Sequence, residues 1–279
     1  MWLTKIIEAI LYPYKCLSTE KLTKYLNGKT VLLTGASYGI GEALAYLLAP
    51  TRAHLILVAR TQDKLELVQR KIATLGGEAV IFQADLRVEA NVDALATFVE
   101  TEYGGLDFFV SNAGKSICRP LTESLDRYHD FSRTMALNYF APVRLMLRLI
   151  PLLSQTRGQV VHVSAVNVLL PPIPHWAAYQ SSKVATDAWF RSAMPELYTQ
   201  GISVSLIYLP LVRTPMIEPT VRYSDMPAMS AEHAAKQIAR TMLSKRKMVK
   251  PWWLFFCELP ALCFRRLWDF FVCKFYKIH

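Results

Sequence analysis

Between residues 28 and 250, short apolar runs alternate with longer segments in which apolar side chains recur at helical spacing. Nearly continuous apolar runs are typical of parallel strands that are covered on both faces. We expect seven strands, over residues 30–34, 54–59, 79–84, 106–111, 159–164, 203–209 and 246–250. We expect helices over residues 42–49, 62–75, 89–102, 129–154, 177–200 and 231–244. This alternation predicts one α/β domain, a three-layer doubly wound parallel sheet of about seven strands.

The two ends of the chain follow a different pattern. In residues 1–27 the apolar side chains fall on one face of a predicted helix, with Lys5 and Glu8 off that face. This stretch lacks the basic region, the uninterrupted apolar run and the cleavage site of a signal peptide. Residues 251–279 are dense in Trp and Phe, but charges interrupt them well short of the ~20 apolar residues of a membrane-spanning helix. We therefore expect amphipathic helical extensions at 1–27 and 251–279 around the domain at 28–250.

The net charge of +10 is concentrated at these ends. Residues 1–30 carry +3 and residues 245–279 carry +6, whereas the residues between them carry only +1. A nearly neutral middle argues against nucleic-acid binding. Basic, aromatic and amphipathic ends favour peripheral attachment to an anionic membrane surface. The alternative is that they cap the core or form a dimer interface.

The cysteines indicate the compartment. The chain has five, with no C-x-x-C pair: Cys16, Cys118, Cys257, Cys263 and Cys273. An odd number without metal-ligand spacing argues against a disulfide framework or a metal site and favours a reducing compartment.

A glycine-rich turn follows the first predicted strand. Residues 31–41 read V-L-L-T-G-A-S-Y-G-I-G, with Gly35, Gly39 and Gly41 directly before a helix-forming run. Such a turn lets backbone N–H groups approach a pyrophosphate at a helix N-terminus. In a strand–turn–helix context this predicts a dinucleotide site, although a tight strand-to-helix connection is the alternative.

The end of the second predicted strand bears on which dinucleotide binds. NAD sites commonly place an acidic residue there, but here Ala59 is followed by Arg60, and no carboxylate comes before Asp63. A guanidinium can pair with the 2′-phosphate of NADP through two hydrogen bonds. Arg60 therefore favours NADPH, unless it is only a solvated residue at a helix start.

Tyr179 and Lys183 are the candidate catalytic pair. Residues four apart on a helix share a face, so the phenol and the ammonium can meet one ligand. A nearby cation favours the phenolate, which lets a tyrosine exchange a proton with a carbonyl oxygen. Tyr25 and Lys29 match the same spacing, but only Tyr179 lies on the helix after the fifth strand.

In this order the motifs resemble the short-chain dehydrogenase/reductase family over roughly residues 28–250. The matching residues are T-G-A-S-Y-G-I-G (34–41), Asp85, S-N-A-G (111–114), Asn138, Ser164 and Y-Q-S-S-K (179–183). The resemblance implies a Rossmann fold and hydride transfer from a nicotinamide. It further implies that Tyr179 is the proton donor, that Lys183 holds the nicotinamide ribose and lowers the tyrosine pKa, and that Asn138 seats a water.

The resemblance also implies the cofactor contacts. Asp85 and Leu86 would line the adenine, and Thr214 would contact the nicotinamide carboxamide. The full implied set is Gly35, Ser37, Tyr38, Gly39, Ile40, Gly41, Arg60, Asp85, Leu86, Asn112, Ala113, Gly114, Tyr179, Lys183, Pro210 and Thr214. No metal is implied.

Two positions depart from the family pattern. Aligned from the fifth strand, Ala165 stands where the family has its carbonyl-holding serine, so either Ser164 takes that role or the site relies on Tyr179 and a water. After the sixth strand, Pro210 is followed by Leu211, where many relatives have glycine.

A narrower likeness concerns the substrate. The blocks at 128–140 and 208–217 are similar to bacterial long-chain fatty acyl-CoA reductases of wax-ester synthesis, although His129, Asp130 and Arg133 fit a surface polar cluster equally well. This implies an NADPH-dependent reductase of a long-chain lipid carbonyl, cytoplasmic and peripheral on the inner face of a membrane. The alternatives are a 3-ketosphinganine-type or other lipid ketone reductase, and a degenerate NADPH- or lipid-binding member without turnover. A homodimer or homotetramer is compatible with the sequence.

Overall fold

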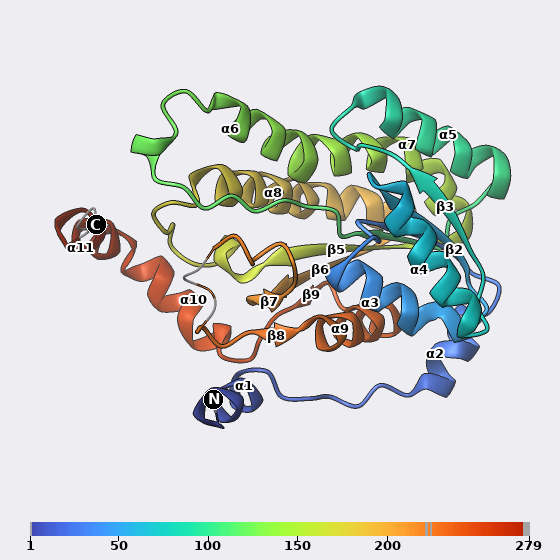
Figure 1. Ribbon diagram of the computed structural model, residues 1–279, viewed down its shortest axis with the longest axis horizontal. Helices are drawn as coiled ribbons and strands as arrows, with labels where there is room; N and C mark the ends of the chain where they lie inside the picture. The colour runs from blue at the N-terminus through green and yellow to red at the C-terminus, as the bar shows by residue number, and fades with distance from the viewer. Residues whose placement is uncertain (1, 221–222, 224, 276–279) are drawn as a thin grey trace.

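Seven parallel strands form one sheet through the middle of the molecule (Figure 1). The structure is a computed structural model, and it describes residues 2–220, 223 and 225–275. The strands are β1 (Thr30–Thr34), β2 (His54–Ala59), β3 (Ala79–Gln83), β4 (Phe108–Ser111), β5 (Gln159–Ala165), β6 (Ser203–Leu209) and β9 (Met248–Val249). Their order, β3-β2-β1-β4-β5-β6-β9, confirms the predicted doubly wound α/β fold.

The strand bounds agree with the apolar runs to within one residue, except at two places. The fourth strand begins at Phe108, two residues later than predicted, because Asp107 turns its carboxylate to the backbone N–H of Thr30 (2.9 Å) and to the Lys29 ammonium (2.8 Å). The seventh strand is only two residues long, where five were predicted. Its pairing with β6 is limited to Leu206 and Ile207.

Helices cover both faces of the sheet and create two cores. On one face lie α2 (Thr19–Leu26), α3 (Gly39–Leu48), α4 (Gln62–Thr74) and α9 (Ala231–Ser244). On the other lie α5 (Glu89–Tyr103), α7 (Ala141–Thr156) and α8 (Ala177–Thr199). Short 3₁₀ turns occur at Ala49–Thr51, Leu121–Glu123 and Val166–Val168. Because both faces are covered, the strands need continuous rather than alternating apolar sequence.

The predicted helix over 129–154 is more complex than its pattern. It consists of α6 (Tyr128–Met135), a π-helical turn at Ala136–Phe140 and α7. Within the described residues, this continuous stretch of 29 residues is long and apolar enough to cross a membrane, but 44% of its apolar window is buried inside the protein. A core helix meets the same criteria, and α7 packs on the sheet.

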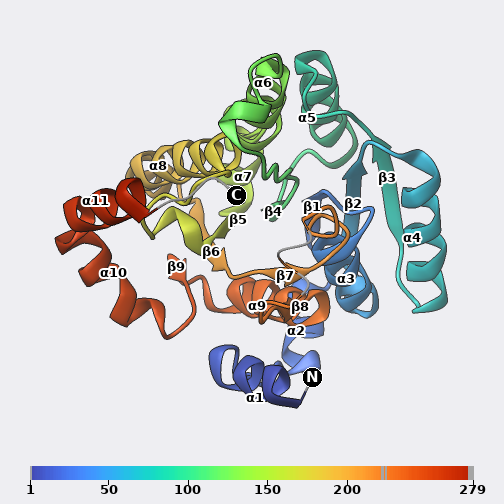
Figure 2. The same ribbon diagram turned by 60° about the vertical axis from the view of Figure 1, so that its left-hand side comes forward.

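Helices also form at both ends of the chain, as α1 (Trp2–Leu11), α10 (Leu254–Cys263) and α11 (Arg265–Phe275) (Figure 2). Leu254 is fully buried, so close packing continues past residue 250, where we drew the domain boundary. A short sheet that the pattern did not predict pairs β7 (Val212–Arg213) with β8 (Met229–Ser230). It closes the base of the segment between Thr214 and Ala228.

Candidate active site

The glycine turn lies at the carboxyl end of β1. The strand order of the sheet reverses between β1 and its neighbour β4. Ligands of doubly wound sheets bind at this position. Gly35 and Gly39 have φ of +70° and +64°, which few other residues adopt. A Cβ on Gly41 would lie 2.1 Å from the Gly35 carbonyl oxygen, so only glycine allows helix and turn to approach. The first turn of α3 has no side-chain cap, which leaves its N–H groups available to an anion.

The segment after β4 is braced against this turn. The Asn112 side-chain amide donates to the carbonyl oxygens of Thr34 (3.0 Å) and Gly35 (3.1 Å). The Thr34 hydroxyl accepts from the backbone N–H groups of Asn112 (3.1 Å) and Ala113 (3.2 Å). The ends of β1 and β4 are therefore fixed together.

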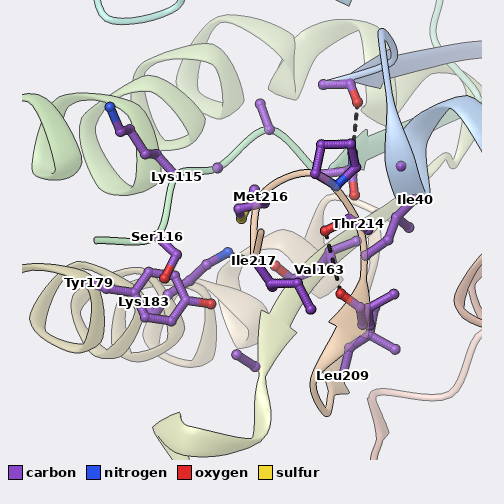
Figure 3. Close-up of a pocket in the computed structure, with 18 of the residues that line it drawn as sticks. Ile40, Lys115, Ser116, Val163, Tyr179, Lys183, Leu209, Thr214, Met216 and Ile217 are labelled. Carbon is purple, nitrogen blue, oxygen red and sulfur yellow. Dashed lines mark hydrogen bonds between the residues drawn. The ribbon is translucent and has the colours of Figure 1, made fainter. Parts of the chain in front are cut away.

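Tyr179 and Lys183 lie one turn apart on α8 and face the same cavity (Figure 3). The Lys183 ammonium donates to the Val163 carbonyl oxygen at 2.9 Å, and burial lowers its pKa to about 8. Burial raises the pKa of Tyr179, with the neighbouring Tyr223 phenol adding to the effect. Desolvation of the phenol is the larger of the two causes, and the lowering of the Tyr179 pKa by the Lys183 ammonium stays a prediction for the site with its cofactor bound.

One cavity of about 810 Å³ joins the glycine turn to Tyr179, a size typical of small-molecule sites. Of the predicted site residues, it is lined by Gly35, Ser37, Tyr38, Gly39, Ile40, Arg60, Asp85, Leu86, Asn112, Ala113, Gly114, Ser164, Tyr179, Lys183, Pro210 and Thr214. Across the cavity from Tyr179 and Lys183 lie Met216 and Ile217, on the loop after β7 (Figure 3).

Two predicted residues lie behind the cavity wall. Gly41 packs against the turn, as described above. Asn138 is 1% exposed and holds the backbone of Lys115 from both sides, accepting from its N–H at 2.8 Å and donating to its carbonyl oxygen at 2.9 Å. The Asn138 side-chain amide also donates to the Ser182 hydroxyl (2.9 Å), and the Asn138 backbone carbonyl oxygen accepts from the Thr186 hydroxyl (2.7 Å). The π-helical turn thus places Asn138 between the β4 loop and α8.

Two charged residues that line the cavity, Arg87 and Asp85, form an ion pair that the sequence did not lead us to expect. Arg87 donates from Nε to the Asp85 carboxylate at 2.9 Å and lowers the pKa of that carboxyl. Arg87 lines the cavity, and its position two residues after Asp85 was the available signal. Arg60 lines the same end and is exposed.

The cavity lining contains two serine hydroxyls that could hold a substrate carbonyl, those of Ser164 and Ser116. Ser164 is 3% exposed, and among the described residues its Oγ has no hydrogen-bond partner. Ala165 also lines the cavity and has no polar side chain. Ser116, which we did not predict, is a second hydroxyl in the lining, two residues after Gly114 and on the Tyr179 side (Figure 3).

The polar residues of α6 lie outside the cavity lining. Asp130 is buried and forms ion pairs with Arg119, Arg127 and Arg133, while His129 Nε2 lies 3.6 Å from its carboxylate. None of these five is among the residues that line the cavity. They form a polar cluster at the start of α6, as the sequence suggested, but its centre is the buried Asp130 carboxylate rather than a surface group.

Residues 29–224 match the short chain dehydrogenase family. The chain belongs to the short-chain dehydrogenase/reductase family. It is 43% identical over 225 residues to a fatty acyl-CoA reductase of Acinetobacter baylyi, which covers 80% of this chain and 76% of that relative. It is 41% identical over 227 residues to a fatty acyl-CoA reductase of Mycobacterium tuberculosis, covering 81% of this chain and 77% of the relative.

Solved structures agree with this short-chain dehydrogenase/reductase fold. A metagenomic short-chain oxidoreductase in complex with NADP aligns with a TM-score of 0.68 at 28% identity, covering 81% of this chain and 98% of that one. A short-chain type dehydrogenase/reductase from Mycobacterium marinum aligns with a TM-score of 0.76 at 23% identity, over 84% of this chain and 97% of its own. At this identity the likeness supports the fold and carries no statement about activity. Among the residues that the structure describes, no cluster of His, Cys, Asp and Glu is suited to a metal ion.

Proposed function

We propose that this protein is an NADPH-dependent reductase of a long-chain fatty acyl-CoA or fatty aldehyde. The observation that carries the proposal is a single cavity that joins a dinucleotide turn, Tyr179, Lys183 and many apolar residues. The two fatty acyl-CoA reductases that are 43% and 41% identical to the chain support the choice of substrate.

The residues at the nucleotide end fit NADPH. The uncapped first turn of α3 suits a diphosphate. Glycine allows the tight turn before it, because a Cβ would lie 2.9 Å from Ala113 Cα at Gly35 and 2.9 Å from the Thr214 side chain at Gly39. Arg60 is exposed and free to pair with a 2′-phosphate, whereas Arg87 is already paired with Asp85. The NADP complex of the metagenomic relative supports a nicotinamide cofactor in this family. The proposed contacts are the cofactor residues predicted from the sequence.

When bound, NADPH would supply a hydride to the substrate carbonyl carbon, which converts an aldehyde to the alcohol, or an acyl-CoA to the aldehyde with release of the CoA thiol. Tyr179 is proposed to donate its proton to the carbonyl oxygen, because its raised pKa keeps the phenol protonated at neutral pH. Lys183 would hold the cofactor ribose with the ammonium protons that Val163 does not use. Ser164 would hydrogen-bond the carbonyl, and Asn138 would fix the β4 loop beside it.

We further propose peripheral attachment to the inner face of a membrane from the cytoplasm. Support comes from the exposed Phe and Leu side chains of α10 and α11 and from the basic residues Arg265, Arg266 and Lys274 among them. A homodimer or homotetramer is proposed on family resemblance alone, and sedimentation velocity measures it. The domain limits at 1–27, 28–250 and 251–279 are proposed with the amendment that Leu254 belongs to the packed core.

A second candidate is reduction of a lipid ketone, such as 3-ketosphinganine. A hydroxysteroid 11-beta-dehydrogenase 1-like protein of Gallus gallus is 34% identical over 235 residues, covering 82% of this chain and 80% of its own. A third candidate, a member that binds NADPH or lipid without turnover, rests on Ala165 at the serine position.

The deciding experiment measures NADPH oxidation by the purified full chain. The substrates are palmitoyl-CoA, hexadecanal and 3-ketosphinganine, with product identification by mass spectrometry. We expect turnover of the acyl-CoA or the aldehyde and its loss in Tyr179→Phe, with the Kd for NADPH unchanged because only the hydroxyl is removed. Turnover of the ketone alone would favour the second candidate. NADPH binding without turnover of any substrate would favour the third.

A further inference from the structure

Two residues from opposite ends of the chain line the same cavity. Tyr12 follows α1 and is 8% exposed, and Trp253 directly precedes α10. Both lie outside residues 29–224, the part that matches the family. The terminal extensions therefore contribute to the wall of the substrate cavity as well as to the outer surface.

Many of the residues that line the cavity are apolar. One set of them comes from the loop after β5, the start of α8 and the segment between β7 and β8: Ile173, Trp176, Met216, Ile217, Pro219, Tyr223, Met226 and Pro227. Trp176 and Tyr223 are in ring contact, with centroids 5.7 Å apart. Apart from the Tyr223 hydroxyl and the Trp176 indole N–H, the side chains of this set are hydrocarbon or thioether and are suited to a hydrocarbon chain.

Specific contacts hold α1 against the cavity wall. The Glu8 carboxylate accepts from the Ala228 backbone N–H at 3.0 Å and forms an ion pair with Arg213, at the base of the β7–β8 segment. The Tyr12 hydroxyl donates to the Pro227 carbonyl oxygen at 3.4 Å. Hydrogen bonds and an ion pair thus join the N-terminal extension to both ends of the segment between β7 and β8.

A further contact joins α1 to the segment before α10. The Trp252 indole, two residues before α10, donates to the Ile10 carbonyl oxygen at 3.0 Å, so the end of α1 is joined to the segment that leads into α10. The Trp268 indole of α11 donates to the Pro172 carbonyl oxygen at 3.2 Å, next to Ile173 of the wall. The segment before α10 and the helix α11 therefore both contact residues beside the cavity lining, as α1 does.

The outer faces of these helices are apolar and basic. Large side chains that are at least one-third exposed are Ile6, Ile7 and Ile10 on α1, Phe255, Phe256, Leu259 and Leu262 on α10, and Leu267, Trp268, Phe270, Phe271 and Phe275 on α11. Lys5, Arg265, Arg266 and Lys274 are exposed among them. Exposed apolar side chains with excess positive charge complement an anionic lipid surface better than a second copy of this basic chain.

We propose that the long-chain substrate passes directly between an anionic bilayer and the cavity, at the junction of α1 and α10, with Trp253 and Tyr12 in contact with its hydrocarbon chain. The inference rests on the proposed function in taking the substrate to be a long-chain lipid. Its physical basis is that a chain moving along this route stays against apolar groups throughout, because the exposed faces of α1 and α10 adjoin the cavity that Tyr12 and Trp253 line. The two terminal residues would then set the chain-length preference.

The first test compares substrate lengths in solution. Trp253→Ala should lower the ratio of kcat/KM for a 16-carbon to an 8-carbon acyl-CoA or aldehyde by about tenfold or more, because only the longer chain reaches the ring. Trp253→Phe should keep the ratio within about twofold, since it keeps an aromatic ring and removes an indole N–H that has no partner among the described residues. Phe255→Asp is the matched control for that ratio, because Phe255 lies two residues further along the chain, on α10, is 74% exposed and is not in the lining.

Phe255→Asp also tests the route. With hexadecanal dissolved in phosphatidylcholine vesicles containing phosphatidylserine, this variant should bind vesicles less tightly and turn over more slowly, while matching wild type on a water-soluble short aldehyde. An unchanged length ratio in Trp253→Ala, or equal turnover by wild type and Phe255→Asp on the vesicles, would overturn the proposal.

A readout without turnover separates this inference from the proposed function. A palmitate carrying a terminal diazirine is added to wild-type protein on the same vesicles and irradiated, and the labelled peptides are identified by mass spectrometry. We expect labels in the peptides that contain Tyr12 or Trp253. Labelling there by an enzyme that reduces none of the lipids would support the route and refute the reductase. An active enzyme labelled only elsewhere would refute the route.

Discussion

Lys183 is the residue at which the proposed chemistry and the stability of the fold conflict. Burial lowers its pKa from 10.5 to about 8, so at neutral pH the folded chain encloses an ammonium that the unfolded chain exposes to water. The difference of about 2.5 pKa units corresponds to roughly 3 kcal/mol of lost stability at pH 7. Lys183→Met removes the charge, keeps an unbranched chain and loses the hydrogen bond to the Val163 carbonyl oxygen.

The sign of the pH dependence follows from proton binding. Between the folded pKa of about 8 and the unfolded value of 10.5, the unfolded chain holds more protons, so raising the pH through this range stabilises the wild type. From pH 7 to about pH 9.5, the free energy of unfolding of the wild type should rise by about 2 kcal/mol relative to Lys183→Met. The hydrogen bond lost in the variant is absent at both pH values, and other titrating groups cancel in the comparison.

Urea unfolding of both proteins without NADPH, at these two pH values, measures the difference. Lys21→Met is the control, because the Lys21 side chain is exposed in the folded chain as well as in the unfolded one. A difference between wild type and Lys183→Met that does not change with pH would refute the reasoning, since Lys183 would then not titrate in this range. Saturating NADPH, an anion bound beside the ammonium, should reduce the pH dependence.

Three further predictions concern the cofactor and the serine. Gly41→Ala should abolish NADPH binding measured by fluorescence, because its Cβ would lie 2.1 Å from the Gly35 carbonyl oxygen. Gly28→Ala is the control: Gly28 has φ of +70° but no atom within 4 Å of the added Cβ, so this variant should lose only about 1–2 kcal/mol of stability and keep the Kd for NADPH. Arg60→Asp should weaken NADPH binding roughly 10- to 100-fold and favour NADH, since a charge-assisted pair contributes about 1.5–3 kcal/mol; wild type that uses both cofactors equally would contradict this. Ser164→Ala should lower kcat at least about tenfold if Ser164 holds the carbonyl, and near-normal kcat would show that another hydroxyl such as Ser116 does so.

The fold could be predicted because its signal is local. Each strand of a sheet covered on both faces must be apolar along its whole length, and this makes the runs at 30–34, 54–59 and 203–209 visible with correct bounds. The helix over 231–244 was visible because one face of it alone meets the sheet. The glycine turn and the spacing of Tyr179 and Lys183 are local in the same sense, and the fold placed both on one cavity.

The sequence could not predict features that depend on distant partners. The π-helical turn around Asn138 accommodates contacts with Lys115 and with Ser182 and Thr186, which come from other elements. The pairing of β7 with β8 involves only two residues each, too few to leave a pattern.

The sequence by itself determined the order of strands and helices, the dinucleotide turn and the identity of the candidate catalytic pair, because each of these is encoded within a few neighbouring residues. The tertiary structure decided how those residues behave. Enclosure in a low-dielectric cavity raises the pKa of Tyr179 against the effect expected from its neighbouring lysine. Packing of both termini on the core brings Tyr12 and Trp253, 241 positions apart, to one cavity. Solvent exclusion and long-range packing are properties of the whole folded chain, and no short stretch of sequence contains them.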